Sequence, residues 1–163
     1  YTRDVCVDYA YGFNGRNGNL LFTGAPGLGK TFLSASIARV VSEKGYSVVY
    51  DTAMHIFDRF EDQKFGRDED GTVESDVERI LNCDLLILDD LGTEMTTAFV
   101  QSALYQIINT RLMEKKSTII STNISRDALA TRYSPQIASR LHGDFQRLTF
   151  VGEDIRILKN RGL

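Results

Sequence analysis

The chain has 163 residues, of which 42% are hydrophobic and 25% charged, which is typical of one globular domain with a real core and excludes a low-complexity chain. The formal net charge of −3 excludes a global basic field for nucleic acid, so any such contact requires a local patch. No apolar run approaches membrane-spanning length, and the widely separated Cys6 and Cys83 predict reduced thiols in a cytoplasmic protein rather than a disulfide framework.

Apolar runs between turn residues predict five strands along the chain. These strands begin near residues 19, 47, 84, 117 and 145. Helical periodicity predicts the helices that connect them. These helices cover 2–11, the segment that ends at Gly45, 53–60, 73–81, 97–115, and two short helices split near Ser134 and Pro135. The charged segment 61–72 is predicted as a loop, and the tail after the last strand carries Arg156, Lys159 and Arg161.

Strands that alternate with helices predict a parallel sheet of the α/β class, covered on both faces. Ligands of such sheets bind beyond the carboxyl ends of the strands. A glycine-rich loop, Asp89 and Asn123 each follow the apolar core of a predicted strand. We therefore expect one edge of the sheet to bring these three features together.

The glycine-rich loop at 24–31 matches the phosphate-binding pattern G-x-x-x-x-G-K-S/T in full. Glycines let successive N–H groups point at phosphate oxygens, and the helix that follows adds the positive end of its dipole. Lys30 is predicted to reach the β- and γ-phosphates of ATP, and the Thr31 hydroxyl to take a Mg²⁺ position. A chance match in a turn is the alternative, but an apolar strand precedes the loop and an apolar helix follows it. The predicted nucleotide-binding residues are Gly24, Ala25, Pro26, Gly27, Leu28, Gly29, Lys30, Thr31 and Phe32.

Residues 85–90, Leu-Leu-Ile-Leu-Asp-Asp, have the form of a Walker B strand, in which four apolar residues deliver a carboxylate to the strand tip. Asp89 is predicted to hold Mg²⁺ through water, opposite Thr31. Asp90 is the candidate that orients or activates the attacking water, and Glu94 is its rival for that role. The alternative for the two adjacent carboxylates is an ordinary exit from a strand into a turn.

Two further polar residues each have a functional and a structural interpretation. Asn123, at the end of a strand, is placed to contact the γ-phosphate or the attacking water, or it caps the helix that begins near Arg126. Arg140, on a short helix, is either a solvated helix residue or an arginine finger. An arginine finger given in trans stabilises charge in the transition state at a neighbour's nucleotide.

Residues 59–67 interleave basic and aromatic side chains, namely Arg59, Phe60, Lys64, Phe65 and Arg67. Such a mixture can bind a single nucleic-acid strand by charge and stacking. The surrounding segment is rich in Asp and Glu, which favours a solvated loop with two core phenylalanines.

Taken together, these features resemble the AAA+ ATPases, and within them the replicative helicase loaders of the DnaC/DnaI type. The phosphate loop is generic to many NTPases, whereas the segments D-D-L-G-T-E and S-R-L are more specific. The resemblance rests on Gly24-Ala-Pro-Gly-Leu-Gly-Lys-Thr-Phe-Leu33, Asp84-Leu-Leu-Ile-Leu-Asp-Asp-Leu-Gly-Thr-Glu94, Thr118-Ile-Ile-Ser-Thr-Asn123, Arg132-Tyr-Ser-Pro-Gln-Ile-Ala-Ser-Arg-Leu141 and Gly152-Glu-Asp-Ile-Arg156.

The resemblance implies a P-loop NTPase (AAA+) three-layer sandwich around a five-stranded parallel sheet. Asn123 matches the sensor 1 position, and Arg140 matches the arginine finger. Proteins of the DnaA/DnaC type place an extra helix that contacts single-stranded DNA after the second strand, which makes Arg59, Lys64 and Arg67 candidates for DNA contact. The implied partner is a replicative helicase.

We expect residues 1–163 to be an AAA+ ATPase domain taken from a longer protein, because the chain begins with Tyr1 rather than Met. In the family that it resembles, the helicase contact lies mainly in an N-terminal region, which is absent here. The chain ends soon after its last strand, so we expect no full C-terminal lid and assign no lid-borne second sensor arginine.

The sequence thus predicts a cytoplasmic ATPase that binds ATP or ADP with Mg²⁺, self-associates and hydrolyses weakly unless assembled. It is predicted to couple ATP and single-stranded DNA to helicase loading in DNA replication, without contact to a membrane. Three alternatives stay open: a transposition helper ATPase of similar fold, a small-molecule P-loop kinase, and an interaction module whose nucleotide is structural.

Overall fold

The computed structural model describes residues 1–153 of the chain. The basic tail residues Arg156, Lys159 and Arg161, and the end of the 152–156 segment, lie outside the described residues.

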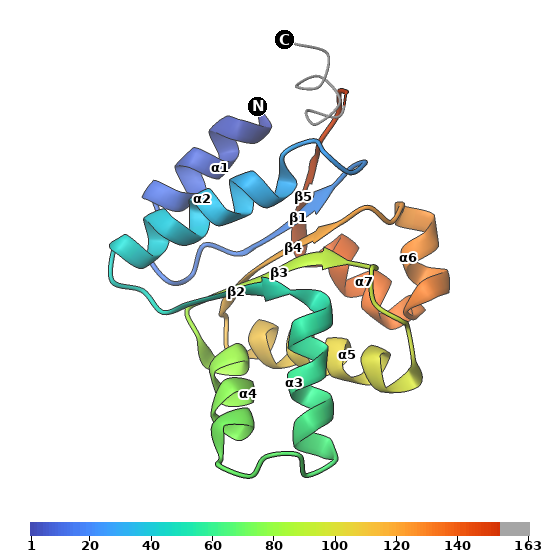
Figure 1. Ribbon diagram of the computed structural model, residues 1–163. Helices are drawn as coiled ribbons and strands as arrows, with labels where there is room; N and C mark the ends of the chain where they lie inside the picture. The colour runs from blue at the N-terminus through green and yellow to red at the C-terminus, as the bar shows by residue number, and fades with distance from the viewer. Residues whose placement is uncertain (154–163) are drawn as a thin grey trace, which may run out of the picture.

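The fold is built on one parallel sheet of five strands in the order β2-β3-β4-β1-β5 (Figure 1). The strands are β1 (Asn19–Thr23), β2 (Val48–Thr52), β3 (Leu85–Leu91), β4 (Ser117–Thr122) and β5 (Phe145–Thr149). The predicted α/β fold with a five-stranded parallel sheet is confirmed. Because all strands run in the same direction, their carboxyl ends meet at one edge, where the phosphate-binding motif begins.

The sheet is covered by helices on both faces, with α1 and α2 on one side and α3, α4, α5 and α7 on the other (Figure 1). The helices within residues 1–153 are α1 (Thr2–Tyr11), α2 (Lys30–Glu43), α3 (Ala53–Lys64), α4 (Thr72–Asn82), α5 (Ala98–Met113), α6 (Arg126–Arg132) and α7 (Pro135–Gly143). Across this part of the chain, no helix has the length and apolar character that a membrane crossing requires.

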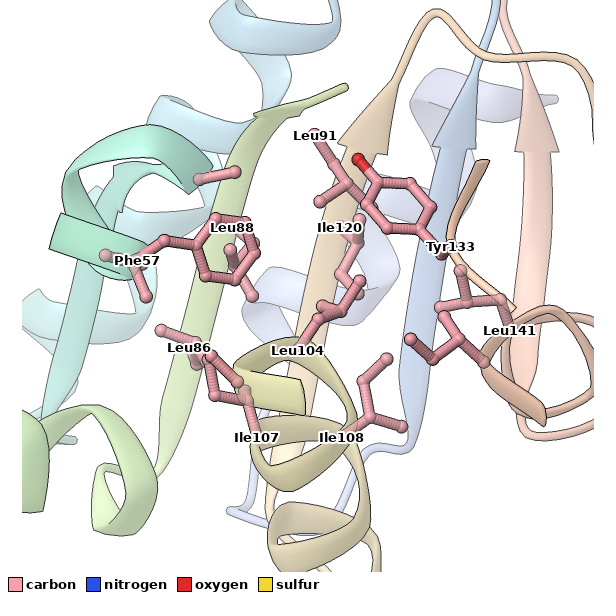
Figure 2. Close-up of a cluster of buried hydrophobic side chains, with 14 of the residues drawn as sticks. Phe57, Leu86, Leu88, Leu91, Leu104, Ile107, Ile108, Ile120, Tyr133 and Leu141 are labelled. Carbon is pink, nitrogen blue, oxygen red and sulfur yellow. The ribbon is translucent and has the colours of Figure 1, made fainter. Parts of the chain in front are cut away.

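The buried apolar side chains form one cluster on each face of the sheet. Successive side chains of a strand point to opposite faces. Leu86 and Leu88 of β3 therefore join the cluster under α3 and α5 (Figure 2), whereas Leu85 and Ile87 join the cluster under α1 and α2. This arrangement explains why β3 is a continuous apolar run rather than an alternating one.

Helix α3 runs to Lys64, beyond the expected end at Phe60, so the predicted loop at 61–72 was wrong over its first residues. Ile56, Phe57 and Phe60 anchor one face of α3 in the core. The charged residues that follow continue the helix on its outer face, because charge alone does not break a helix. Phe65, expected in the core by the loop interpretation, is 58% exposed.

Arg111 of α5 is 1% exposed and ties the end of α4 to the starts of β3 and β4. Its guanidinium donates hydrogen bonds to the carbonyl oxygens of Ile80 (3.1 Å), Leu81 (3.1 Å), Cys83 (2.9 Å) and Ser117 (2.7 Å), and to Thr118 Oγ1 (2.9 Å). Burial lowers the pKa of Arg111 from its ordinary value. An arginine nevertheless keeps its charge in a protein, so these acceptors are what compensate it.

We predict that Arg111→Met strongly destabilises the fold, because it leaves several buried carbonyl oxygens without a donor. Each unpaired acceptor costs roughly 1–3 kcal/mol, so the free energy of unfolding should fall by about 3 kcal/mol or more. Urea denaturation measures this loss. As a control, Arg39→Met removes an exposed arginine whose partner is Glu43 and should leave the urea midpoint unchanged. Equal midpoints for Arg111→Met and the wild type would contradict the prediction.

Candidate nucleotide-binding site

The loop between β1 and α2 has the backbone geometry of a phosphate cradle. Gly24, Gly27 and Gly29 have φ angles of 143°, 78° and 93°, in the region that favours glycine. A side chain at Gly24 would also clash with the carbonyl oxygen of Phe150, which follows the neighbouring strand β5. The first glycine of the motif is thus required both by its backbone angle and by its close approach to β5.

Lys30 is the first residue of α2 and is 5% exposed. Its ammonium group folds back over the loop, where it donates to the carbonyl oxygens of Gly24 at 2.6 Å and Ala25 at 2.7 Å. Helix α2 has no side-chain cap at its start. Its first N–H groups and its positive dipole end therefore suit an anion held in the loop.

The Asp89 carboxylate, near the carboxyl end of β3, is 3% exposed and accepts hydrogen bonds from three hydroxyl groups. Thr31 Oγ1 donates to Asp89 Oδ2 at 2.9 Å, and Tyr50 Oη donates to the same oxygen at 3.1 Å. Ser121 Oγ of β4 donates to Asp89 Oδ1. Burial and the charge of Asp89 raise the pKa of the Tyr50 hydroxyl, so that this group keeps its proton and acts as the donor.

Asp90 lies beside Asp89 in a left-handed backbone conformation, with a φ angle of 54°. Aspartate tolerates this conformation better than most residues. The Asp90 N–H donates to Ser121 Oγ at 3.0 Å. The Ser121 hydroxyl therefore orients both carboxylate residues, one through its side chain and the other through its backbone.

These elements surround a cavity of about 470 Å³ at the carboxyl edge of the sheet. Its walls come from the loop, the start of α2 and the ends of β3 and β4. The lining residues are Pro26, Gly27, Gly29, Lys30, Thr31, Asp90, Thr93 and Asn123. Most of the predicted loop residues thus share one cavity with Asp90 and Asn123, and Asp89 lies directly behind Thr31. Phe32 is not among the residues that line the cavity and is 73% exposed.

Glu94 does not line this cavity. Its side chain is 6% exposed and accepts hydrogen bonds from the Gly92 N–H at 2.8 Å and from Tyr133 Oη. Burial and the nearby Glu94 raise the pKa of Tyr133, which keeps that hydroxyl protonated as a donor. Of the two rivals for the water-orienting role, Asp90 is the one at the cavity.

Asn123 is exposed at the cavity and does not cap the following helix. The cap of α6 is Ser125, whose side chain accepts from the Ala128 N–H. The alternative interpretation of Asn123 as a cap was therefore wrong by two positions, because the chain turns once more before α6 begins.

Arg140 lies on α7, away from the cavity of its own chain. Its side chain is 50% exposed and pairs with Asp144 at 3.5 Å. It lines a separate depression with Tyr105 and Pro135. This position leaves the guanidinium accessible to another molecule.

The basic residues after β2 are partly compensated by acidic neighbours. Arg59 lies 4.0 Å from Asp76, and Arg67 lies 3.6 Å from Asp62. Lys64 Nζ lies 4.9 Å from the centre of the Phe99 ring. The arrangement keeps Lys64 and exposed Phe65 at the surface, at the end of α3.

Three residues of the site were not predicted from the sequence: Tyr50, Thr93 and Ser121. Thr93 lines the cavity and donates through Oγ1 to the Asp90 carbonyl oxygen at 3.0 Å. Ser121 gave a weak signal, as a hydroxyl inside an apolar strand. Tyr50 gave no signal, because its contact with Asp89 joins residues 39 positions apart.

The donor set fits a magnesium ion. Thr31 and Asp89 offer a hydroxyl and a carboxylate within 2.9 Å of each other, and Mg²⁺ is usually held by one or two carboxylates together with substrate phosphates. Within residues 1–153, no cluster of three or more His, Cys, Asp or Glu side chains could hold a metal by itself. A phosphate in the loop, together with water, would complete the coordination of an ion held by these two residues.

Residues 5–138 match the model of a family described as IstB-like ATP binding protein. Because this match covers most of the chain, the chain belongs to the family of IstB-like ATP-binding proteins.

Individual relatives confirm the resemblance to AAA+ domains of the DnaC/DnaI type. The replicative helicase loader DnaC of Buchnera aphidicola subsp. Baizongia pistaciae (strain Bp) is 26% identical over 150 residues, which is 91% of this chain and 61% of that relative. A crystal structure of the DnaC helicase loader has a TM-score of 0.77 and 26% identity, covering 90% of this chain and 86% of that chain. The replication initiator DnaA bound to AMPPCP and single-stranded DNA has a TM-score of 0.77 at 22% identity, covering 97% of this chain and 49% of that chain, and supports the fold alone.

We predict that Ser121→Ala loosens the end of β3, because it removes a donor to Asp89 and the acceptor of the Asp90 N–H. An unpaired group of this kind costs roughly 1–3 kcal/mol in the free energy of unfolding. Hydrogen exchange should quicken at the Asp90 amide. The matched control is Ser36→Ala, which removes an exposed hydroxyl bonded to the Phe32 carbonyl oxygen. Ser36→Ala should keep the wild-type exchange rate at the Asp90 amide. The prediction fails if Ser121→Ala keeps that rate as well.

Proposed function

We propose that this domain binds and hydrolyses ATP, and that it acts as an ATPase within an assembly of subunits. The observation that carries the proposal is one cavity that joins the phosphate loop to Asp90 and Asn123, with the buried Asp89 directly behind Thr31. Loop, carboxylates and amide come from the ends of three different strands, an arrangement that suits phosphoryl transfer to water.

Each residue has a distinct role in this proposal. The loop N–H groups and Lys30 hold the β- and γ-phosphates, which replace the loop carbonyl oxygens as partners of the Lys30 ammonium. Thr31 and Asp89 would hold Mg²⁺, which neutralises charge on the transferred phosphate. Asp90 orients the attacking water, and Asn123 contacts the γ-phosphate or that water.

Arg140 is proposed to act in trans. It lies outside the cavity of its own chain and is half exposed, so in an assembly it can approach the γ-phosphate of a neighbour. Asp144 would have to release the guanidinium, which an exposed ion pair does at little cost. Isolated subunits should then hydrolyse ATP slowly.

The biological role that we propose is the loading of a replicative helicase in DNA replication, in the cytoplasm. Relatives that match most of this chain are named as replicative helicase loaders, although the chain spans only 61% of the length of the first. The similar fold of DnaA occurs in a complex with AMPPCP and single-stranded DNA. The end of α3, with Lys64 and Arg67 around the exposed Phe65, is the proposed DNA contact.

The family description, IstB-like ATP binding protein, states no biological role beyond ATP binding. The transposition helper ATPase considered in the sequence analysis is therefore kept as the second candidate. Binding assays of the full-length protein with a replicative helicase and with a transposase, each with ATP and DNA, separate the two roles.

ATP turnover per subunit is predicted to rise with protein concentration and with single-stranded DNA, because the catalytic arginine comes from a neighbour. The measurement is steady-state phosphate release over a range of concentrations. Lys30→Ala should abolish turnover, since it removes the cation that holds the phosphates. A turnover rate per subunit that changes neither with protein concentration nor with single-stranded DNA would overturn the assembly mechanism and favour the small-molecule kinase. Tight ATP binding without turnover under any condition would favour the interaction module.

Arg140→Ala is predicted to lower the assembly-stimulated rate by about 10³-fold, the size of an arginine-finger effect. Nucleotide affinity of the isolated subunit should not change. The control Arg16→Ala, in the loop before β1, should leave the assembly-stimulated rate unchanged.

Mixing two inactive variants tests the action in trans. Subunits with Lys30→Ala keep the arginine, and subunits with Arg140→Ala keep the phosphate loop. Random equal mixing should restore about a quarter of the wild-type rate, since half of the sites are intact and half of those receive an intact arginine. No recovery, in a mixture that still assembles, would contradict a finger supplied in trans.

A further inference from the structure

Tyr50 connects the open edge of the sheet to the buried carboxylate Asp89. Tyr50 lies on β2, which is an edge strand, and β2 pairs with β3, which carries Asp89. The Tyr50 hydroxyl donates to Asp89 Oδ2 at 3.1 Å, and Thr31 Oγ1 donates to the same oxygen at 2.9 Å. A residue outside every recognised motif therefore shares its acceptor with the proposed metal-binding threonine.

Core packing does not account for the position of Tyr50. The side chain is 38% exposed and belongs to neither buried cluster. Its ring lines an open groove of about 710 Å³ that follows β2, together with Ala38 and Ser42 of α2 and His55 of α3. The groove is open beside this side chain, and the hydrogen bond to Asp89 is the polar contact that holds its hydroxyl group.

The hydrogen bond from Tyr50 helps to orient Asp89 Oδ2, a carboxylate oxygen at the proposed magnesium site. Asp89 is 3% exposed, and a buried carboxylate depends on its donors for both charge compensation and orientation. Ser121 holds Oδ1, while Thr31 and Tyr50 hold Oδ2. If Thr31 turned its hydroxyl oxygen towards a cation, Tyr50 and Ser121 would still hold the carboxylate in place.

We propose that Tyr50 is a positioning residue of the magnesium site, acting through Asp89 on the affinity for Mg²⁺ when nucleotide is bound. The proposal rests on the nucleotide-binding function proposed above. Partners that orient a metal-binding carboxylate typically change metal affinity or activity by 10- to 100-fold when they are removed. Tyr50 contributes one of three such donors, so its loss should have an effect at the lower end of this range.

The test is the affinity for ADP, measured by calorimetry with Mg²⁺ and again with EDTA. The ratio of the two affinities reports the metal site without requiring turnover. In Tyr50→Phe this ratio should fall about tenfold relative to the wild type, whereas the affinity in EDTA should not change. The control Tyr46→Phe removes a hydroxyl just before the same strand, from a ring that packs on Phe13, and should keep the wild-type ratio.

A double variant tests whether Tyr50 acts through Asp89. Asp89→Asn should lower the ratio by itself, and adding Tyr50→Phe should then lower it no further. An unchanged ratio in Tyr50→Phe, or an equal fall of both affinities, would overturn the role of Tyr50. If the wild-type protein bound ADP with the same affinity in Mg²⁺ and in EDTA, that result would instead contradict the metal site of the proposed function.

Discussion

The Asp89 carboxylate is the point on which the candidate site depends. It is nearly inaccessible to solvent, and its donors come from α2, β2 and β4. A buried charge of this kind is stable only when its hydrogen bonds are made, so the four elements must keep a fixed mutual position. The start of α2, which carries the phosphate loop, is thereby tied to the centre of the sheet.

Strand order places the remaining polar groups around this point. β4 lies between β1 and β3, so the residues at its end stand between the phosphate loop and the two aspartates. Ser121 is turned inward to Asp89, while Asn123 is exposed at the cavity. A parallel sheet with crossover helices produces this convergence, because it brings all carboxyl ends to one edge.

The segment that leaves β3 runs from the cavity, which Thr93 lines, to the end of α6, just before α7 and its Arg140. Glu94 bonds to both Gly92 and Tyr133, and Arg132 donates to the Glu94 carbonyl oxygen at 2.8 Å. Tyr133 and Arg132 stand at the end of α6, immediately before α7. The network fixes the segment after β3 against the end of α6, because buried members of a polar network lose hydrogen bonds when they separate.

The sequence by itself determined the strands, the parallel sheet and the location of the phosphate loop, because apolar periodicity, glycine spacing and the Lys30–Thr31 pair are local signals. It also placed Asp89 and Asn123 at strand ends, although the roles of these residues stay predictions. Only the tertiary structure decided the strand order, the choice of Asp90 over Glu94 at the cavity and the contact of Tyr50 with Asp89. These outcomes depend on which distant residues become neighbours in the fold, and hydrogen bonds between such residues leave no periodic pattern in the chain.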